Sequence, residues 1–279
     1  MKGLLVSAAL GALVVASPAE AQLPISNVPS PSPVTKMARD SRLHRESKAA
    51  VTSEPPSAAT VIGRNLLLGG ANGLLRISSP AGALQIERFT MLGEMISDPT
   101  QQCLIDVGGE TTIGTKNLGR PDGLERFEAD IPACPFEFDI LDGAVLVPGQ
   151  FRACVFKDAD CQASPSGLWG PDGASLLTDA KQTVQARTSA EAAMDVNYRT
   201  LEAGLSDRSR ADALADEQSR FLSDREDICR KYSHEDSHRF CTIRLTEARA
   251  AFLKARTDEL PKDAAKKPAP RPHRRKPAQ

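Results

Sequence analysis

Apolar side chains recur every three or four residues in the last third of the chain, and this spacing predicts helices. A first stripe covers residues 184–205, and Asp207 is a suitable N-cap for the next helix. The second stripe ends at Cys229 and the third begins at Cys241. Such stripes bury little alone, so we expect an antiparallel three-helix bundle over residues 178–260.

Residues 61–176 follow a different pattern, in which short runs of alternating apolar and polar positions are separated by turn signals. The run 136–141 leads through Asp142-Gly143 into a second apolar run, which predicts a β-hairpin. Several short strands of this kind predict a small antiparallel β-sandwich or barrel. The expected fold class is therefore α+β with two domains, the second containing a disulfide-linked helical hairpin.

Both ends of the chain have compositions that do not favour a packed core. Residues 1–21 combine a positive start, a short apolar run and an A-x-A site, which predicts a cleaved signal peptide. Residues 22–60 are rich in proline and serine and are expected to be a disordered linker. Residues 261–279 are expected to be a disordered basic, proline-rich tail. We therefore expect a periplasmic or secreted protein with no transmembrane span in the mature chain.

Apart from the basic tail, the charge of the chain indicates little about its partners. The formal net charge of the chain is -1, which does not favour a nucleic-acid-binding protein. Between Lys262 and Gln279 seven basic residues stand against Asp263 alone. This tail could bind an anionic envelope polymer, or it could serve only to solubilise the protein.

The cysteines fit an exported protein. An even count of six predicts disulfides, for which 15 complete pairings exist. Proximity in the sequence favours Cys229–Cys241 and Cys154–Cys161, and it leaves Cys103–Cys134 as the third pair. The cysteines lack the C-x2-C spacing of a zinc site.

A short match to the H-E-x-x-H zinc motif is formed by His234, Glu235 and His238. On a helix it would place two imidazoles on one face, with Glu247 or Glu259 as a third ligand. The match lies in a polar loop between two cysteines, so we do not expect a catalytic metal. A structural zinc or copper ion on the two histidines is a variant of the same hypothesis.

Three further features have a structural and a functional interpretation. The glycines of residues 69–73 lack the pattern of a phosphate-binding loop and are interpreted as a turn. Trp169 could anchor a ligand, but a lone tryptophan beside glycines is more typical of a core plug. Arg225 and Arg249 lie on apolar stripes, where they could cover the core edge and reach acceptors or could present a binding surface.

The two stripes next to the cysteine loop also form a recognisable pattern. They read Q-x2-F-x3-R-x3-C and C-x4-T-x2-R-x3-L, and the residues that carry the pattern are Gln218, Phe221, Arg225, Cys229, Cys241, Thr246, Arg249 and Leu253. This pattern resembles the LprI family of lysozyme inhibitors, in which tryptophan usually occupies the position of Phe221. Tyr198 is similar to the tyrosine of that family's L-N-x2-Y element. The family often has another cysteine pair near its first helix, and this chain has none there.

The resemblance covers roughly residues 179–258 and implies a helical domain that inhibits lysozyme. The β-rich segment resembles uncharacterised exported proteins of alphaproteobacteria and implies no activity. We therefore expect an exported, non-enzymatic cell-envelope binding protein without a cofactor, whose partner is a lysozyme-like glycosidase or another envelope protein. The alternatives are a zinc-dependent hydrolase using His234, Glu235 and His238, a glycan hydrolase in the β-rich domain, and a purely structural envelope protein.

Overall fold

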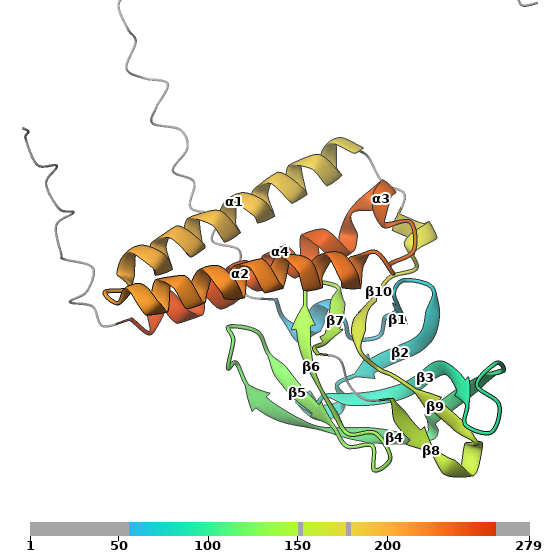
Figure 1. Ribbon diagram of the computed structural model, residues 1–279. Helices are drawn as coiled ribbons and strands as arrows, with labels where there is room; N and C mark the ends of the chain where they lie inside the picture. Colours follow the sequence, from blue (N-terminus) through green and yellow to red (C-terminus); the bar gives the residue numbers. More distant parts are fainter. Residues whose placement is uncertain (1–55, 150–152, 177–179, 261–279) are drawn as a thin grey trace, which may run out of the picture. The chain divides into compact units, whose positions relative to one another are not determined.

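Ten antiparallel strands form one sheet, and eight of them close into a barrel (Figure 1). The computed structural model describes residues 56–149, 153–176 and 180–260. The barrel strands are β1 (Asn65–Leu68), β2 (Asn72–Ser78), β3 (Gln85–Met95), β4 (Gln102–Gly119), β5 (Arg126–Ala129), β6 (Phe136–Leu141), β7 (Ala144–Val147) and β10 (Gly167–Gly170). The pairing of β2 with β3 closes the ring, and β9 (Cys161–Ala163) and β8 (Cys154–Phe156) extend the sheet beyond β3.

The sheet can close because its long strands bend. β3 pairs with β4 from Glu94 opposite Gln102 to Arg88 opposite Gly108, and the register then jumps to Ile86 opposite Ile113. The jump places several residues of β4 opposite a single residue of β3, which is a large bulge. Gly108 and Gly109 have φ values of 100° and 93° at this bulge, a conformation that glycine adopts without strain.

Aromatic side chains fill the barrel interior. Trp169 and Phe89 are fully buried, with ring centroids 5.3 Å apart, and Phe136 lies 5.2 Å from Phe89. The indole nitrogen of Trp169 donates a hydrogen bond to the Pro165 carbonyl at 2.8 Å. The interpretation of Trp169 as a core plug is therefore confirmed.

Four helices follow the barrel, with bounds α1 (Ala180–Gly204), α2 (Arg208–Cys229), α3 (Glu235–His238) and α4 (Phe240–Asp258). Short 3-10 helices lie at Ala58–Thr60, Pro80–Gly82, Lys157–Ala159 and Gly173–Leu176. Asp207 caps α2 as expected, since its side chain accepts a hydrogen bond from the Ser209 amide. Among the described residues, no helix is both long and apolar enough to cross a membrane.

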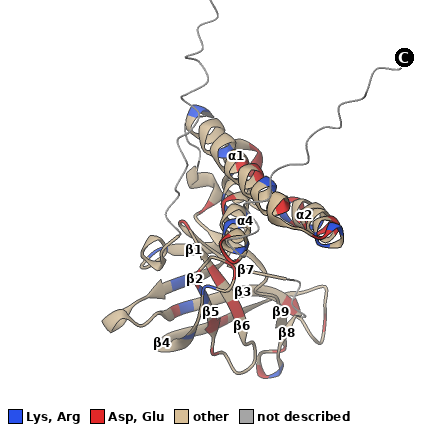
Figure 2. Ribbon diagram, turned by 90° about the vertical axis from the view of Figure 1, so that its left-hand side faces the viewer, with Lys and Arg blue, Asp and Glu red and all other residues tan. Residues whose placement is uncertain are grey.

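Helix α4 lies between the barrel and α1 (Figure 2). Near its start, Cys241 and Leu245 pack on the outward-facing Leu141 and Leu168 of the barrel. Near its end, Leu253 packs with residues of α1 and α2. A helix that is buried on several sides carries apolar residues around its circumference, which explains why α4 has no clean amphipathic stripe.

The predicted fold class is therefore wrong. The β-rich part is a closed eight-stranded barrel with an added hairpin, so the barrel alternative is present and the sandwich alternative is not. The helical part has four helices, and α4 shares a hydrophobic cluster with the barrel, so it is not a separate three-helix bundle. The first predicted stripe is also incorrect at Val184, which is 64% exposed, whereas the small side chain of Ala190 is buried.

Three disulfides join the cysteines in the pairs Cys103–Cys161, Cys134–Cys154 and Cys229–Cys241. The expected pair Cys229–Cys241 is confirmed, but Cys154–Cys161 and Cys103–Cys134 are wrong. On the β8–β9 hairpin, Cys161 lies opposite Phe156 rather than Cys154, so neighbouring positions in the sequence do not meet. Three disulfides indicate an oxidising environment such as the periplasm or the cell exterior.

Several predicted segments lie outside the described residues, namely the signal peptide (1–21), the linker up to residue 55 and the tail (261–279). The last residues of the predicted linker form a structured turn instead. Ser57 caps the 3-10 helix Ala58–Thr60, and the Thr60 hydroxyl donates to the Leu141 carbonyl and accepts from the Gly143 amide.

Candidate functional site

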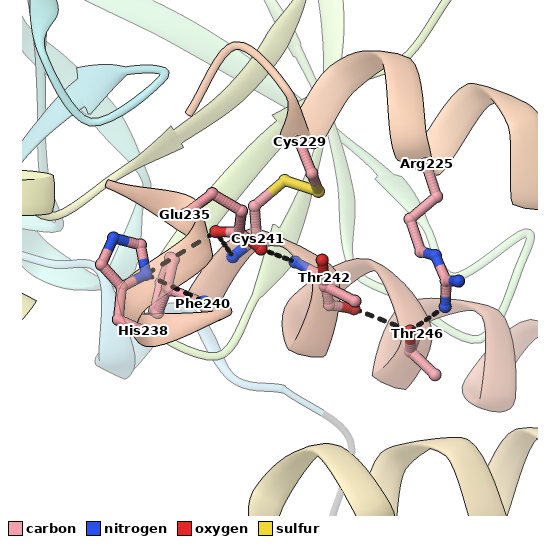
Figure 3. The surroundings of a disulfide bond; sticks show 8 residues. All are labelled: Arg225, Cys229, Glu235, His238, Phe240, Cys241, Thr242 and Thr246. Atoms are coloured by element: carbon pink, nitrogen blue, oxygen red, sulfur yellow. Dashed lines mark hydrogen bonds and ion pairs between the residues drawn. A yellow bond between two sulfur atoms is a disulfide. The ribbon is translucent and has the colours of Figure 1, made fainter. Parts of the chain in front are cut away.

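The cysteine pair and two residues of the zinc-like motif, Glu235 and His238, lie together where α2, α3 and α4 meet (Figure 3). The disulfide joins Cys229, the last residue of α2, to Cys241 near the start of α4. The Glu235 carboxylate accepts hydrogen bonds from the amides of Cys241 at 3.0 Å and Thr242 at 2.8 Å. These amides belong to the first turn of α4, where N–H groups lack partners within the helix. Glu235 therefore caps α4 and places a negative charge at its N-terminus.

His238 is 4% exposed, and both of its ring nitrogens form hydrogen bonds. Its Nδ1 accepts from the Phe240 amide at 3.0 Å, so the ring proton lies on Nε2. Nε2 donates that proton to the Ser233 carbonyl at 2.8 Å. The imidazole thus ties the two ends of the α3 turn together and has no lone pair free to bind a metal.

The other members of the zinc motif do not complete a metal site. His234 is exposed and has a left-handed backbone with φ of 55°, so it precedes α3 rather than sharing a helix face with His238. Both oxygens of Glu235 are engaged at the start of α4. Within residues 56–149, 153–176 and 180–260, no group of three or more His, Cys, Asp or Glu side chains could hold a metal ion.

The segment between α2 and α3 docks on a glycine turn of the barrel. The Ser233 amide donates to the Gly69 carbonyl at 2.7 Å, and the Tyr232 hydroxyl donates to the Pro171 carbonyl at 2.6 Å. Burial, together with the charge of Glu235, raises the pKa of Tyr232, so its hydroxyl keeps its proton. A Cβ atom at Gly70 would lie 2.6 Å from the Tyr232 ring. The glycine turn predicted from the sequence is confirmed. Gly70 lets the Tyr232 ring approach the backbone of this turn closely.

A polar seam joins α2 to α4 beyond the disulfide. The Arg225 guanidinium donates to the Thr246 hydroxyl at 2.7 Å, and that hydroxyl donates to the Thr242 carbonyl. Arg249 is 7% exposed and donates from Nε to the Gln218 side chain at 2.9 Å. Both arginines thus have acceptors, which supports the structural interpretation of these charges.

Arg249 also lies between two phenylalanine rings. Its guanidinium carbon is 5.4 Å from the Phe221 ring centroid and 4.8 Å from that of Phe252. A second nitrogen donates to the Glu217 carboxylate at 2.6 Å. Cation–π contact and a charge-assisted hydrogen bond together hold this side chain between the helices.

Most residues of the family-like pattern are therefore brought together at one interface. Phe221 of α2 and Arg249 of α4 contact each other. Tyr198 of α1 and Leu253 of α4 belong to the hydrophobic cluster in which α1, α2 and α4 meet. Sequence reasoning missed Glu217, which receives hydrogen bonds from two arginines, because one acidic residue on a charged helix carries no distinguishing signal.

The pH dependence of the seam follows from Glu217. Burial opposes its ionisation, but hydrogen bonds from Arg249 and Arg256 outweigh this effect, and the pKa of Glu217 is lowered. Its contribution to stability is therefore complete above the pKa of an unfolded glutamate and is lost as pH falls through the lower, folded value. We expect Glu217→Gln to weaken α2 protection at neutral pH and to flatten its acid dependence, as hydrogen exchange at several pH values would measure. A wild-type-like acid profile in the variant would contradict this role.

A hollow of about 240 Å³ lies beside the junction of α3 and α4, and it is lined by residues of α1 and α4 together with Leu176 and His238. Arg244 is the charged group in its wall. One nitrogen of Arg244 contacts Asp142 at 3.2 Å and Glu247 at 2.7 Å, and its guanidinium lies over the Phe240 ring. The His238 imidazole and the Nη1 nitrogen of Arg244 thus already have partners within the fold, whereas the buried Nε of Arg244 has no hydrogen-bond partner among the described residues.

Comparison with known proteins adds no family to this description. No family model, no curated protein and no solved structure matches the chain.

Proposed function

We propose that the protein is an exported, non-enzymatic binding protein of the cell envelope, and that its partners include lysozyme-like glycosidases. The main support is that the side chains of His238 and Glu235 form hydrogen bonds with backbone groups of the fold. A general acid, base or metal ligand must present such groups to a substrate. This observation favours binding over catalysis and disfavours the zinc-hydrolase alternative.

The choice of lysozyme-like partners rests on the resemblance of residues 218–253 to the LprI family. Contacts within the pattern support it, since Arg249 contacts both Gln218 and Phe221. The sequence pattern thus corresponds to a packed structural unit. An inhibitor built on this unit would cover the cleft that holds the two carboxylates of a glycosidase.

A cell-wall turbidity assay tests the proposal. The purified protein is mixed with lysozyme and bacterial cell walls, with a matched sample containing a chelator. Protection that increases to completion with the molar ratio of protein to lysozyme, with or without chelator, is the expected result. Undiminished clearing at a large excess of protein would remove lysozyme from the proposal, and chelator-sensitive cleavage of the walls by the protein alone would replace binding with enzymatic activity.

A further inference from the structure

The β3–β4 hairpin exposes large apolar side chains on the outside of the barrel. Leu92 and Leu104 are directly opposite each other and are 45% and 60% exposed. Val155 of β8 is 47% exposed, and the register through Gln162 and Glu94 places it on the same outer face. Exposed apolar groups that gather on one face indicate an interaction site more strongly than scattered ones.

The same hairpin has an open backbone edge. Gln102 to Gly108 of β4 pair with β3 on one side, whereas β5 pairs only with Thr115 to Gly119. In the part of the chain that the structure describes, no strand is paired with the other side of Gln102 to Gly108. Unpaired N–H and C=O groups on a strand edge are a template for the addition of another strand.

A hollow with one carboxylate in its wall, that of Glu94, lies at the end of this edge. Its volume is about 350 Å³, and its wall includes Leu92, Glu94 and Gln102. Glu94 is exposed and has no ion-pair partner among the described residues. Around it, residues 92–102 and 155–163 carry the four carboxylates of Glu94, Asp98, Asp158 and Asp160 against the single cation Lys157.

The negative charge of Asp98 persists at neutral pH. Hydrogen bonds from the side chains of Thr100 and Gln101 and from the Thr100 amide lower the pKa of Asp98. We call the exposed surface formed by Leu92, Glu94 and Leu104 the hairpin tip.

We infer that the hairpin tip binds an extended, basic segment of another protein, which adds as a strand to the free edge of β4. An apolar side chain of the segment covers Leu104, which lies between the added strand and Leu92, and a long lysine or arginine side chain reaches across the start of β4 toward Glu94. A second copy of this chain is a poorer occupant, because two identical acidic tips would repel each other. The inference rests on the proposed binding function but does not require that lysozyme be the partner.

Synthetic peptides test the inference with the full mature protein. The probe is a fluorescent eight-residue peptide of alternating lysine and valine, and binding is followed by fluorescence anisotropy. One comparison peptide has glutamate in place of lysine, and another is N-methylated on alternate backbone amides. We expect the basic peptide to bind at least about tenfold more tightly than either, which corresponds to about 1.4 kcal/mol.

Protein variants locate the binding. Leu104→Lys and Glu94→Lys should each weaken binding of the basic peptide about tenfold. Leu222→Lys and Glu137→Lys are matched controls, since both residues are exposed on other elements, and they should bind as the wild type does. Circular dichroism confirms that each variant is folded.

Equal binding of the basic and acidic peptides, no binding of the basic peptide, or full binding by both tip variants would overturn the inference. These outcomes are independent of the turbidity assay. If the wild type binds the basic peptide but does not inhibit lysozyme, lysozyme is rejected as a partner and the hairpin tip remains a binding surface. If the wild type does not bind the peptide, and Leu104→Lys and Glu94→Lys still inhibit lysozyme, the proposed function stands and the hairpin tip is rejected as a binding surface.

Discussion

Replacing Cys229 and Cys241 together by alanine is expected to lower the free energy of unfolding by about 3 kcal/mol, because the disulfide restricts the unfolded chain. The two cysteines are separated by 12 positions and are 3% and 0% exposed. Alanine is preferred to serine because a buried hydroxyl would add its own desolvation cost. The loss should be concentrated in α2, since Glu235 still caps α4 in the variant.

Denaturant unfolding followed by circular dichroism measures the total effect, and hydrogen exchange locates it. A control variant with Cys134 and Cys154 replaced by alanine removes a disulfide of the barrel instead. Exchange in α2 should increase in the first variant and remain near the wild-type rate in the control. An unchanged unfolding midpoint in the first variant would show that the bridge does not secure α2.

Gly70→Ala should destabilise the protein by roughly 2–5 kcal/mol, the sum of a left-handed backbone penalty and overpacking. Gly70 has φ of 67°, and an added Cβ would lie 2.6 Å from the Tyr232 ring and 3.1 Å from the Gly173 nitrogen. The variant must therefore displace the segment that carries Tyr232 from the barrel. Thermal and denaturant unfolding measure the effect.

Gly63→Ala provides a matched control for the backbone term. Gly63 has φ of 73°, but a Cβ there would meet no atom within 4 Å. The difference between the two variants therefore isolates the contact with Tyr232. Equal destabilisation by both substitutions would mean that the glycine turn does not anchor the helices.

Local features of the fold could be predicted from the sequence because their signals lie close together in the chain. The Asp142-Gly143 turn between β6 and β7 and the cap at Asp207 are both present. Barrel closure could not be predicted in this way, since it depends on β2 pairing with both β1 and β3. Long-range pairing leaves little trace in a local alternation pattern.

The disulfide pattern illustrates the same limit. Proximity in the sequence identified Cys229–Cys241 because the intervening segment folds back as one turn. It misassigned Cys103 and Cys161, which are 58 positions apart and meet only because β9 pairs with β3 next to β4. The partners of the other cysteines were set by the sheet rather than by spacing.

The zinc-like motif shows why residue types alone did not define a site. Glu235 and His238 have the right chemistry, but a four-residue helix with left-handed residues at both ends turns them toward backbone groups. The same side chains then cap α4 and close the turn. The docking of Tyr232 on Gly70 had no sequence signal beyond a glycine pair, although it fixes where these groups lie.

The apparent metal motif of His234, Glu235 and His238 serves to cap α4 and close the α3 turn, and the metal content of the protein tests this structural role. The purified protein is incubated with excess zinc, desalted and measured by inductively coupled plasma mass spectrometry beside His238→Ala. We expect far less than one zinc per chain in the wild type, together with a lower unfolding temperature for His238→Ala. One zinc per wild-type chain that is lost in His238→Ala would show that the motif is a metal site instead.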